Sequence, residues 1–259
     1  MNPPVPNAVL PRWIAVDGPS GSGKSSAARG LAQRLGWSYL DTGATYRAAT
    51  IAALEASVNL DAIVTTDPDA TPASRDASAD AWAALAAEDL HSSTDPQAPG
   101  IFLGPRSVER EVRSADATRW VSAVAAVPAV RRELVAYQRR IALEHRDSGI
   151  VVEGRDIGSV VLPEAPMRIF LTASETARAR RRAGDPSAIA AGDAQPDLEA
   201  TRVDLRRRDR LDESRADTPA GVADGAIVVD SSDLDLEGVV GVLMSLYRQI
   251  FLSAPEQGV

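Results

Sequence analysis

The amino-acid sequence predicts an α/β fold in which a parallel β-sheet is flanked by helices. Short apolar runs recur along the chain, and most are followed by a segment whose apolar residues repeat every three or four positions. Strands that alternate with helices form parallel sheets, because each helix returns the chain to the edge where the next strand begins. With 259 residues, of which 44% are hydrophobic, the chain can bury a sizeable core.

In the first half of the chain, apolar periodicity and glycine define the elements. WIAVD, at residues 13–17, is a continuous apolar run and predicts a buried strand. A glycine-rich turn follows, and apolar residues then recur at helical spacing as far as Gly36, which predicts a helix that ends there. The same criteria give a strand at residues 37–40 and a helix at residues 46–54. Two further short strands are expected at residues 101–103 and 108–112.

The second half of the chain continues the alternation. Helices are expected at residues 117–127 and 129–144, and Pro128 suits a first helical turn because its missing N–H would be unpaired there anyway. Another helix begins around Arg178 and leads into a stretch rich in Gly, Pro and Ala. The remaining strands are expected at residues 149–153, 167–171 and 226–230, and the remaining helices at residues 198–211 and 236–247.

Composition excludes several classes of protein. The chain has no cysteine, so disulfides, thiolate zinc sites and thiol nucleophiles are excluded, which fits a reducing compartment. No apolar run approaches the roughly 20 residues of a membrane span, and residues 1–12 do not resemble a signal peptide. With 28 basic and 36 acidic residues, the net charge of −8 argues against sequence-independent binding to nucleic acid or to an anionic membrane. We therefore expect a cytoplasmic protein.

Charge is distributed unevenly along the chain. Residues 55–100 contain nine acids and one base, which places a charge equal to the net charge of the protein in one segment. This segment is also rich in Ala, Ser, Thr and Pro, so it is interpreted as an inserted, well-solvated region. Arg accounts for 27 of the 28 basic residues, and the only lysine is Lys24.

The glycine-rich turn carries the strongest local motif. Gly18–Ser25 reads GPSGSGKS and satisfies GxxxxGK[ST] between a predicted strand and a predicted helix. Glycines let backbone N–H groups converge on phosphate oxygens at a positive helix end, Lys24 adds a compact charge, and Ser25 offers a hydroxyl to Mg²⁺. The residues expected to bind ATP are Gly18, Pro19, Ser20, Gly21, Ser22, Gly23, Lys24, Ser25 and Ser26, with Ser25 as the metal ligand.

A phosphate loop leaves the second substrate open, but other motifs narrow the class. GTPase switches need a lysine in their base-reading NKxD motif, and the chain has no lysine left for it. An LSGGQ signature of transporter ATPases is also missing from the sequence. A nucleotide or metabolite kinase is therefore the leading class.

Further motifs resemble one kinase family. GPSGSGKSS, YLDTGATYR, SAVAAVPAVRRELV, VVEGRDIGSVVLPEAPMRIFLTAS and RRRDRLDESRADTP occur in this order, and together they closely resemble bacterial cytidylate kinases over residues 13–248. Members of that family transfer the γ-phosphoryl group of ATP to CMP or dCMP. The resemblance implies a P-loop NTPase core at residues 13–55 and 114–248, an acidic insertion that binds the nucleoside monophosphate at residues 56–113, and a helical lid region at residues 178–210. Residues 1–12 remain as a loose N-terminal extension.

The resemblance also implies a role for individual residues. Arg47 and Arg155 would hold the acceptor phosphate, and Asp41 and Thr42 would contribute to the same substrate site. The residues implied to read cytosine are Ser122, Arg131 and Asp156. Those implied to contact ribose and phosphate are Arg208, Asp212 and Arg215, with Asp212 on the sugar hydroxyls. The implied catalytic set is Lys24, Arg155 and the lid arginines Arg178, Arg181 and Arg182.

Elementary chemistry supports these roles. Cytosine presents an amino donor where uracil presents a carbonyl, so oxygen acceptors such as Ser122 and Asp156 would discriminate between the two bases. Arg208, Asp212 and Arg215 are spaced i, i+4 and i+7, which places them on one helix face. A phosphate acceptor is already largely anionic at neutral pH, so the reaction needs no general base.

Alternatives remain at this stage. The chain could be another small P-loop kinase that acts on UMP, AMP or shikimate, or it could be a noncatalytic nucleotide-binding regulator. We expect small-molecule substrates, no nucleic-acid or membrane partner, and a monomer.

Overall fold

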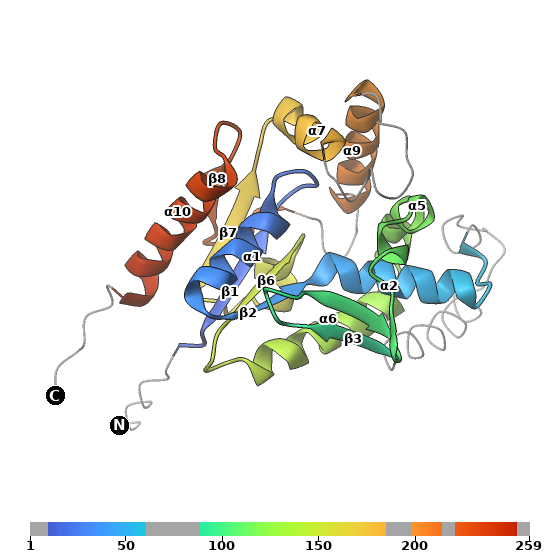
Figure 1. The fold of residues 1–259 in the computed structure, drawn as a ribbon, viewed down its shortest axis with the longest axis horizontal. Helices are drawn as coiled ribbons and strands as arrows, with labels where there is room; N and C mark the ends of the chain where they lie inside the picture. The colour runs from blue at the N-terminus through green and yellow to red at the C-terminus, as the bar shows by residue number, and fades with distance from the viewer. Residues whose placement is uncertain (1–9, 61–88, 185–197, 214–220, 253–259) are drawn as a thin grey trace.

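The computed structural model of the chain describes residues 10–60, 89–184, 198–213 and 221–252, without the side chains of residues 211–213 (Figure 1). A five-stranded sheet with the order β2-β6-β1-β7-β8 forms its centre. All four neighbouring pairs are parallel, as the sequence predicts. The strands are β1 (Trp13–Asp17), β2 (Ser38–Asp41), β6 (Ile150–Gly154), β7 (Met167–Thr172) and β8 (Ile227–Asp230).

The central strand β1 is buried along its whole length because helices cover both faces of the sheet. Ile14 and Val16 belong to the core beneath one layer of helices, whereas Trp13 and Ala15 belong to the core beneath the other. This alternation follows from the two-residue period of a strand. A continuous apolar run such as WIAVD is therefore the expected sequence of a central parallel strand.

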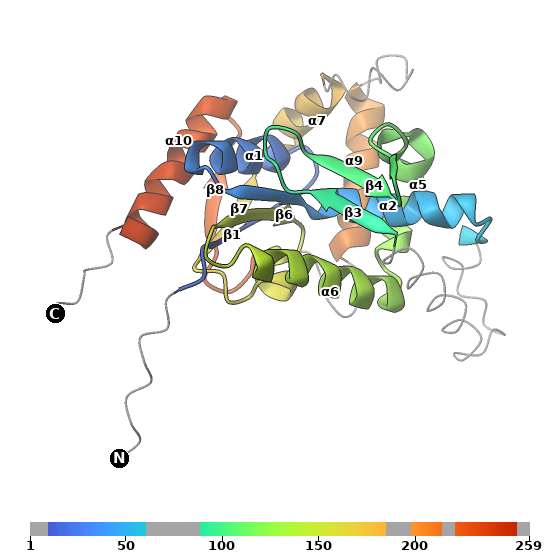
Figure 2. The same ribbon diagram turned by 60° about the horizontal axis from the view of Figure 1, so that its bottom comes forward.

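The helices form two layers, one on each face of the sheet (Figure 2). Helices α1 (Lys24–Leu35) and α10 (Leu236–Tyr247) lie on one face, and the short helical turn η3 (Arg248–Leu252) continues α10. Helix α6 (Pro128–Glu144) lies on the other face, with α2 (Thr42–Glu55) packed against it. The same face carries η2 (Ile157–Val161), a single π-helical turn that follows β6.

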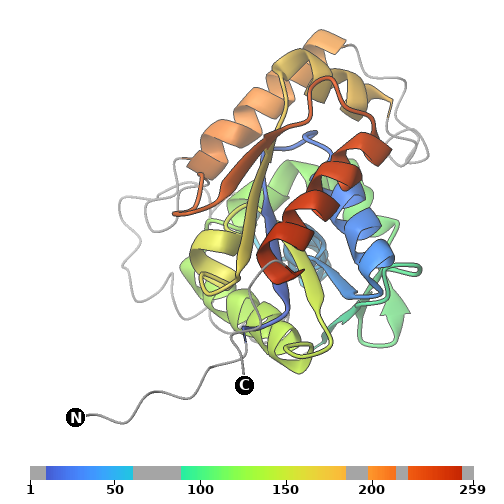
Figure 3. The ribbon, with the colours of Figure 1, turned by 90° about the vertical axis from the view of Figure 1, so that its left-hand side faces the viewer.

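The helices α7 (Glu175–Ala183) and α9 (Leu198–Glu213) lie side by side at the carboxyl ends of the strands (Figure 3). Ser174 begins α7, since its hydroxyl accepts a hydrogen bond from the N–H of Ala177. This cap places the start of the helix before Arg178, where the sequence predicted it to begin. These two helices belong to the region predicted as a lid, whose residues 185–197 lie outside the description.

A second, antiparallel sheet has the order β3-β4-β5 and consists of β3 (Leu90–Ser93), β4 (Gly100–Leu103) and β5 (Arg106–Ser107). It leads through the turn η1 (Glu111–Arg113) into α5 (Ala115–Val124). Two hydrogen bonds join its β3–β4 loop to the core: Tyr39 N to Thr94 O at 2.9 Å, and Gln33 Nε2 to Pro96 O at 2.8 Å. The strands β3, β4 and β5 and the turn η1 belong to the predicted insertion, of which residues 61–88 lie outside the description.

The strand predicted at residues 108–112 is wrong. Val108 and Val112 are both buried, and the N–H of Val112 donates to the carbonyl of Val108 at 2.9 Å, which is a helical contact. Four residues separate the two valines, so they share the face of a helical turn and not the face of a strand. The weakly patterned strand β3 was not predicted.

Most other elements lie where the sequence places them. The strands predicted in the main sheet differ from those observed by one residue or less at each end. Helix α2, however, begins at Thr42 instead of residue 46, because the carboxylate of Asp41 caps it by accepting from the N–H of Ala44. Within the described part of the chain, no helix combines the length and the apolar character needed to cross a membrane.

Gly149, at the entry to β6, provides a test of this packing. Its φ of +100° is a conformation that suits glycine, and a Cβ there would overlap the ring of Trp37. Gly149→Ala should therefore lower the free energy of unfolding by about 2–3 kcal/mol, from backbone strain together with overpacking. Chemical denaturation measures this change.

Gly241 is the matched control, because it is exposed in the middle of α10 and a Cβ there would meet nothing within 4 Å. Gly241→Ala should stabilise the protein by about 0.5–1 kcal/mol through helix propensity. Equal effects of the two substitutions would contradict the assigned packing of Trp37 on Gly149.

Candidate functional site

A cleft of about 730 Å³ lies at the carboxyl ends of the parallel strands, where ligands usually bind to open α/β sheets. The phosphate loop and the start of α1 form one wall, and α2, α5 and the small sheet contribute the opposite wall. The β6–η2 loop, α7, α9 and the start of α10 complete it. The predicted site residues that line it are Ser20, Gly21, Ser22, Gly23, Lys24, Ser25, Ser26, Asp41, Thr42, Arg47, Ser122, Arg155, Asp156, Arg181, Arg182 and Arg208.

Four predicted residues do not line the cleft: Gly18, Pro19, Arg131 and Arg178. Gly18 and Pro19 belong to the part of the loop that leaves β1. Arg131 and Arg178 instead contact residues around the cleft. Two more predictions cannot be placed, because the side chain of Asp212 and all of Arg215 lie outside the description.

The phosphate loop is shaped for close approach of the backbone. Gly21 has φ +78°, and a Cβ there would lie 2.8 Å from the carbonyl oxygen of Arg178. Helix α1 begins directly after the loop, its N-cap Gly23 has no side chain to cap it, and its first turn contains no acidic residue. The first N–H groups of α1 thus lack a side-chain acceptor, and this positive helix end suits a phosphate group.

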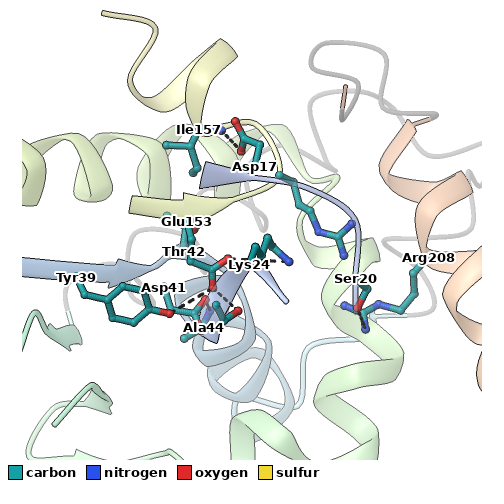
Figure 4. A network of polar contacts seen from close by, with 12 residues as sticks. Asp17, Ser20, Lys24, Tyr39, Asp41, Thr42, Ala44, Glu153, Ile157 and Arg208 are labelled. Atoms are coloured by element: carbon teal, nitrogen blue, oxygen red, sulfur yellow. Dashed lines mark hydrogen bonds and ion pairs between the residues drawn. The ribbon is translucent and has the colours of Figure 1, made fainter. Parts of the chain in front are cut away.

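Lys24 lies beside Glu153, the acid near the end of β6 (Figure 4), and Ser25 contacts the same side chain. The hydroxyl of Ser25 donates to Glu153 Oε1 at 2.7 Å, and the amino group of Lys24 lies 3.9 Å from Glu153 Oε2. Burial lowers the pKa of Lys24, and nearby Arg155 and Arg208 lower it further, although Glu153 opposes this change. A bound phosphate would supply the negative charge that favours the protonated lysine.

Asp41 lies beside Glu153, because β2 and β6 pair in a register that places the two residues opposite each other. Burial raises the pKa of Glu153, and the neighbouring carboxylate of Asp41 raises it further. The next residue, Thr42, donates from its hydroxyl to the carbonyl of Glu153 at 2.7 Å and joins α2 to β6. The edge of the cleft therefore presents two adjacent carboxyl groups close to Lys24.

Arg47 of α2 adds positive charge to the opposite wall. Arg47 Nη1 donates to Val112 O and to Thr118 Oγ1, each at 3.1 Å, which fixes the guanidinium between η1 and α5. Burial lowers the pKa of Arg47 to about 10, and the positive charges of Arg182 and Arg155 contribute to this shift. So many cations around one hollow favour an anionic ligand.

Asp156 and Arg131 form a buried ion pair, with Arg131 Nη2 donating to Asp156 Oδ2. Arg131 also donates to the carbonyl of Ala125 at 3.4 Å. Asp156 lines the same cleft as Ser122 of α5, so the structure brings together the three residues implied to read cytosine. The arginine fixes the carboxylate of Asp156, while the cleft receives oxygen acceptors from both Asp156 and Ser122.

Arg181 and Arg178 bind the backbone of the phosphate loop. Arg181 Nη1 donates to Ser22 O at 3.1 Å and to Ser231 Oγ at 2.9 Å, and Arg181 Nη2 donates to Leu234 O at 3.2 Å. Arg178 Nε donates to Ser20 O at 2.9 Å. In this conformation, both lid arginines brace the loop from α7.

Arg208 of α9 also reaches the loop. Its Nη1 lies 3.4 Å from the hydroxyl oxygen of Ser20, and the two side chains point toward each other in Figure 4. Arg208 is buried although it carries a charge. Helix α9 therefore contributes a cation to the cleft, as the sequence predicts.

Three acids at the site were not predicted: Asp17, Glu153 and Asp209. Glu153 and Asp17 could have been predicted from the sequence. Each is an acid at the carboxyl end of an apolar strand, and this is the edge where parallel sheets bind ligands. Asp209 had no local signal, because its partners Arg155 and Arg178 are distant in the sequence.

Asp17 ties the phosphate loop to the loop that carries Arg155 and Asp156. It is the last residue of β1, and its two carboxylate oxygens accept from the N–H groups of Ile157 and Gly158 at 2.7 and 2.8 Å. Burial raises its pKa from 3.8 to about 6, while the two N–H groups limit this rise. Asp17 is therefore ionised at neutral pH in a site that disfavours its charge.

This pKa predicts how Asp17 affects stability. Its folded pKa exceeds its unfolded pKa, so the contribution of Asp17 to stability is complete below pH 3.8 and is lost as the pH rises through about 6. The free energy of unfolding of the wild type relative to Asp17→Asn should fall by about 2 kcal/mol between about pH 4.5 and 7. Urea denaturation of both proteins at several pH values measures this difference, and a constant difference would contradict the assigned burial.

Comparison with known proteins agrees with this geometry. A sequence model described as "Cytidylate kinase" matches residues 14–249. A cytidylate kinase from Rhodococcus opacus (strain B4) is 48% identical over 231 residues, which cover 89% of this chain and 92% of that protein. A cytidylate kinase from Mycolicibacterium paratuberculosis is 46% identical, and the match covers 91% of this chain and 95% of that protein. A cytidylate kinase from Streptomyces avermitilis is 42% identical, and the match covers 91% of this chain and 92% of that protein. The chain belongs to the cytidylate kinase family.

Proposed function

We propose that the protein transfers the γ-phosphoryl group of ATP to CMP or dCMP, which yields ADP and CDP or dCDP. One observation carries this proposal: a single cleft is lined both by the phosphate loop with Lys24 and by the oxygen acceptors Ser122 and Asp156. The family to which the chain belongs favours the same reaction.

The donor phosphates are assigned to the phosphate loop. Its backbone N–H groups and the start of α1 would bind phosphate oxygens, and Lys24 would follow the transferring group. Arg178 and Arg181 support this assignment indirectly, because they hydrogen-bond the carbonyl groups of Ser20 and Ser22 and thereby leave the N–H side of the loop available. These two arginines thus act through the loop in the conformation described.

The residues present fit a Mg²⁺ ion at the donor site. Ser25, Glu153 and Asp41 offer oxygen atoms next to one another, and the charge of Asp41 contributes to the raised pKa of Glu153. In the described part of the chain, no three His, Cys, Asp or Glu side chains form a cluster able to hold a metal alone. Mg²⁺ suits such a sparse set, because it takes one or two carboxylates together with phosphate oxygens and water. When bound, it would neutralise charge on the donor phosphates.

The acceptor is assigned to the side of the cleft formed by α2, α5 and the β6–η2 loop. Asp156, held by Arg131, and the hydroxyl of Ser122 would accept from the amino group of cytosine. Arg47 and Arg155 would hold the acceptor phosphate, while Arg208 and Asp212 would contact the rest of the nucleotide. Uracil would place a carbonyl against the same acceptors and leave them unpaired.

The chemistry then depends on position and charge. The acceptor phosphate, with a second pKa of about 6, is largely dianionic at neutral pH and attacks without a general base. The residues of the cleft hold the two nucleotides in line and exclude water, and their cations stabilise the charge on the transferring group. Lys24, Arg155 and Arg182 are the cleft residues to which we assign this stabilisation.

Two other functions are weaker fits. A kinase specific for UMP, AMP or shikimate would have no use for the buried Asp156–Arg131 pair at a cleft that Ser122 also lines. A noncatalytic regulator would have no need for so many cations opposite the phosphate loop. A cytoplasmic location and a monomeric state remain predictions.

A panel of acceptors tests the proposal. ATP and Mg²⁺ are supplied with CMP, dCMP, UMP, AMP or shikimate, and ADP formation is measured in a coupled assay. CMP or dCMP should be preferred over UMP by at least about 100-fold in kcat/KM, since mismatched polar groups in a buried site are costly.

Two outcomes would contradict the proposal. Faster turnover of UMP, AMP or shikimate would favour the other kinases, and ATP binding without CMP-dependent ADP formation would favour a regulator. The variant Lys24→Ala is the control for a contaminating kinase. It should abolish ADP formation with every acceptor if this protein is the source of the activity, whereas the activity of a contaminant would persist.

A further inference from the structure

Asp209 of α9 bridges two arginines that come from different elements. Its Oδ2 lies 2.5 Å from Nη2 of Arg178 on α7, and its Oδ1 lies 3.6 Å from Nη1 of Arg155 in the β6–η2 loop. The side chain of Asp209 is 19% exposed, compared with 11% for Arg178 and 17% for Arg155. Ion pairs of this burial are less screened by solvent than surface pairs, so they can fix side-chain positions.

Arg178 anchors this bridge to the phosphate loop. Its guanidinium uses Nε on the carbonyl of Ser20 at 2.9 Å and Nη2 on Asp209. A planar guanidinium that is hydrogen-bonded on two edges has a defined orientation, and this orientation fixes the carboxylate of Asp209 that it binds. A continuous path therefore runs from Ser20 through Arg178 and Asp209 to Arg155.

Arg155 has a different environment, because it lines the cleft. Its charge lowers the pKa of Lys24 on the donor side and the pKa of Arg47 on the acceptor side, so it lies close enough to both to be repelled by them. Asp209 supplies an attractive charge that opposes this repulsion.

We propose that Asp209 is a positioning residue, which holds Arg155 in the orientation that receives the acceptor phosphate. Through Arg178, the same carboxylate ties the position of Arg155 to the phosphate loop, so the sites for the two nucleotides keep a fixed relation. This inference rests on the proposed function, because it takes the acceptor to be a nucleoside monophosphate.

A purely structural role would be to hold α9 against α7. The chain contains a matched control for that role, since Arg206 of α9 pairs with Glu175 of α7 at 2.7 Å outside the cleft. Glu175→Gln removes a charge between the same two helices without touching Arg155. Glu175 and Arg206 are 41% and 52% exposed, so their pair contributes little to stability.

The experiment is a double-mutant cycle on steady-state kinetics. Wild type, Asp209→Asn, Arg155→Ala, the double variant and Glu175→Gln are compared for the KM of CMP, the KM of ATP and kcat. Asp209→Asn should raise the KM of CMP about tenfold and change the KM of ATP less than about twofold, as expected for residues that act through a direct contact. In the Arg155→Ala background, the same substitution should change the KM of CMP less than about twofold.

Arg178→Lys provides a second, independent variant. A lysine has a single ammonium group and cannot orient on Ser20 and Asp209 as the guanidinium does, so the KM of CMP should rise by a smaller factor. Asp209→Glu keeps the charge and should recover part of the loss. These two variants carry the test if Asp209→Asn fails to fold, which circular dichroism would reveal.

The proposal is overturned if the effect of Asp209→Asn persists in the Arg155→Ala background, or if Glu175→Gln reproduces it. An equal rise in the KM of ATP would also overturn it, because Asp209 would then not act specifically on the acceptor site. Failure of the proposed function would be distinguishable, because the wild type itself would then not phosphorylate CMP.

Discussion

The concentration of positive charge at one edge of the sheet is the constraint on which the rest of this structure depends. Lys24, Arg47, Arg155, Arg182 and Arg208 all line a single cleft. Burial lowers the pKa of Lys24 and Arg47, which means that the folded chain holds these charges in an unfavourable environment. The negative charge of bound phosphate groups would stabilise these cations. The same excess of positive charge would therefore favour both nucleotide binding and phosphoryl transfer.

The parallel sheet creates this arrangement. Asp17, Asp41 and Glu153 lie at the carboxyl ends of three neighbouring strands, and the register of the pairs places Asp41 opposite Glu153 and Asp17 opposite Gly154. The three acids make different contacts, since Asp17 holds the backbone of η2, Asp41 caps α2, and Glu153 accepts from Ser25. One edge of the sheet thereby orients the start of α1, helix α2 and the β6–η2 loop together.

Local features were the ones that the sequence predicted well. The buried run at residues 13–17 and the glycine-rich turn before Lys24 are recognisable because their patterns depend only on neighbouring residues. The start of α2 was missed because Gly43 weakens the helical pattern, whereas the cap from Asp41 depends on geometry. Val108 and Val112 were assigned to a strand because short apolar segments suit either element.

Contacts between distant residues explain what could not be predicted. Ser25 and Glu153 are far apart in the chain, and the pairing of β1 with β6 brings them to 2.7 Å. The bridge from Arg178 through Asp209 to Arg155 similarly requires the packing of α7 and α9 over the sheet. The residue types implied by the family resemblance could be named from sequence, but their partners depended on the fold.

The titration of Lys24 tests the electrostatic basis of the site most directly. Because Lys24 is the only lysine of the chain, selective ¹³C and ¹⁵N labelling of lysine gives one side-chain NMR signal to follow against pH. We predict a pKa well below the ordinary 10.5 in the free protein and an upward shift when ATP binds, because phosphate favours the protonated amine. A signal that titrates near 10.5 and does not respond to ATP would contradict the assigned burial of this charge.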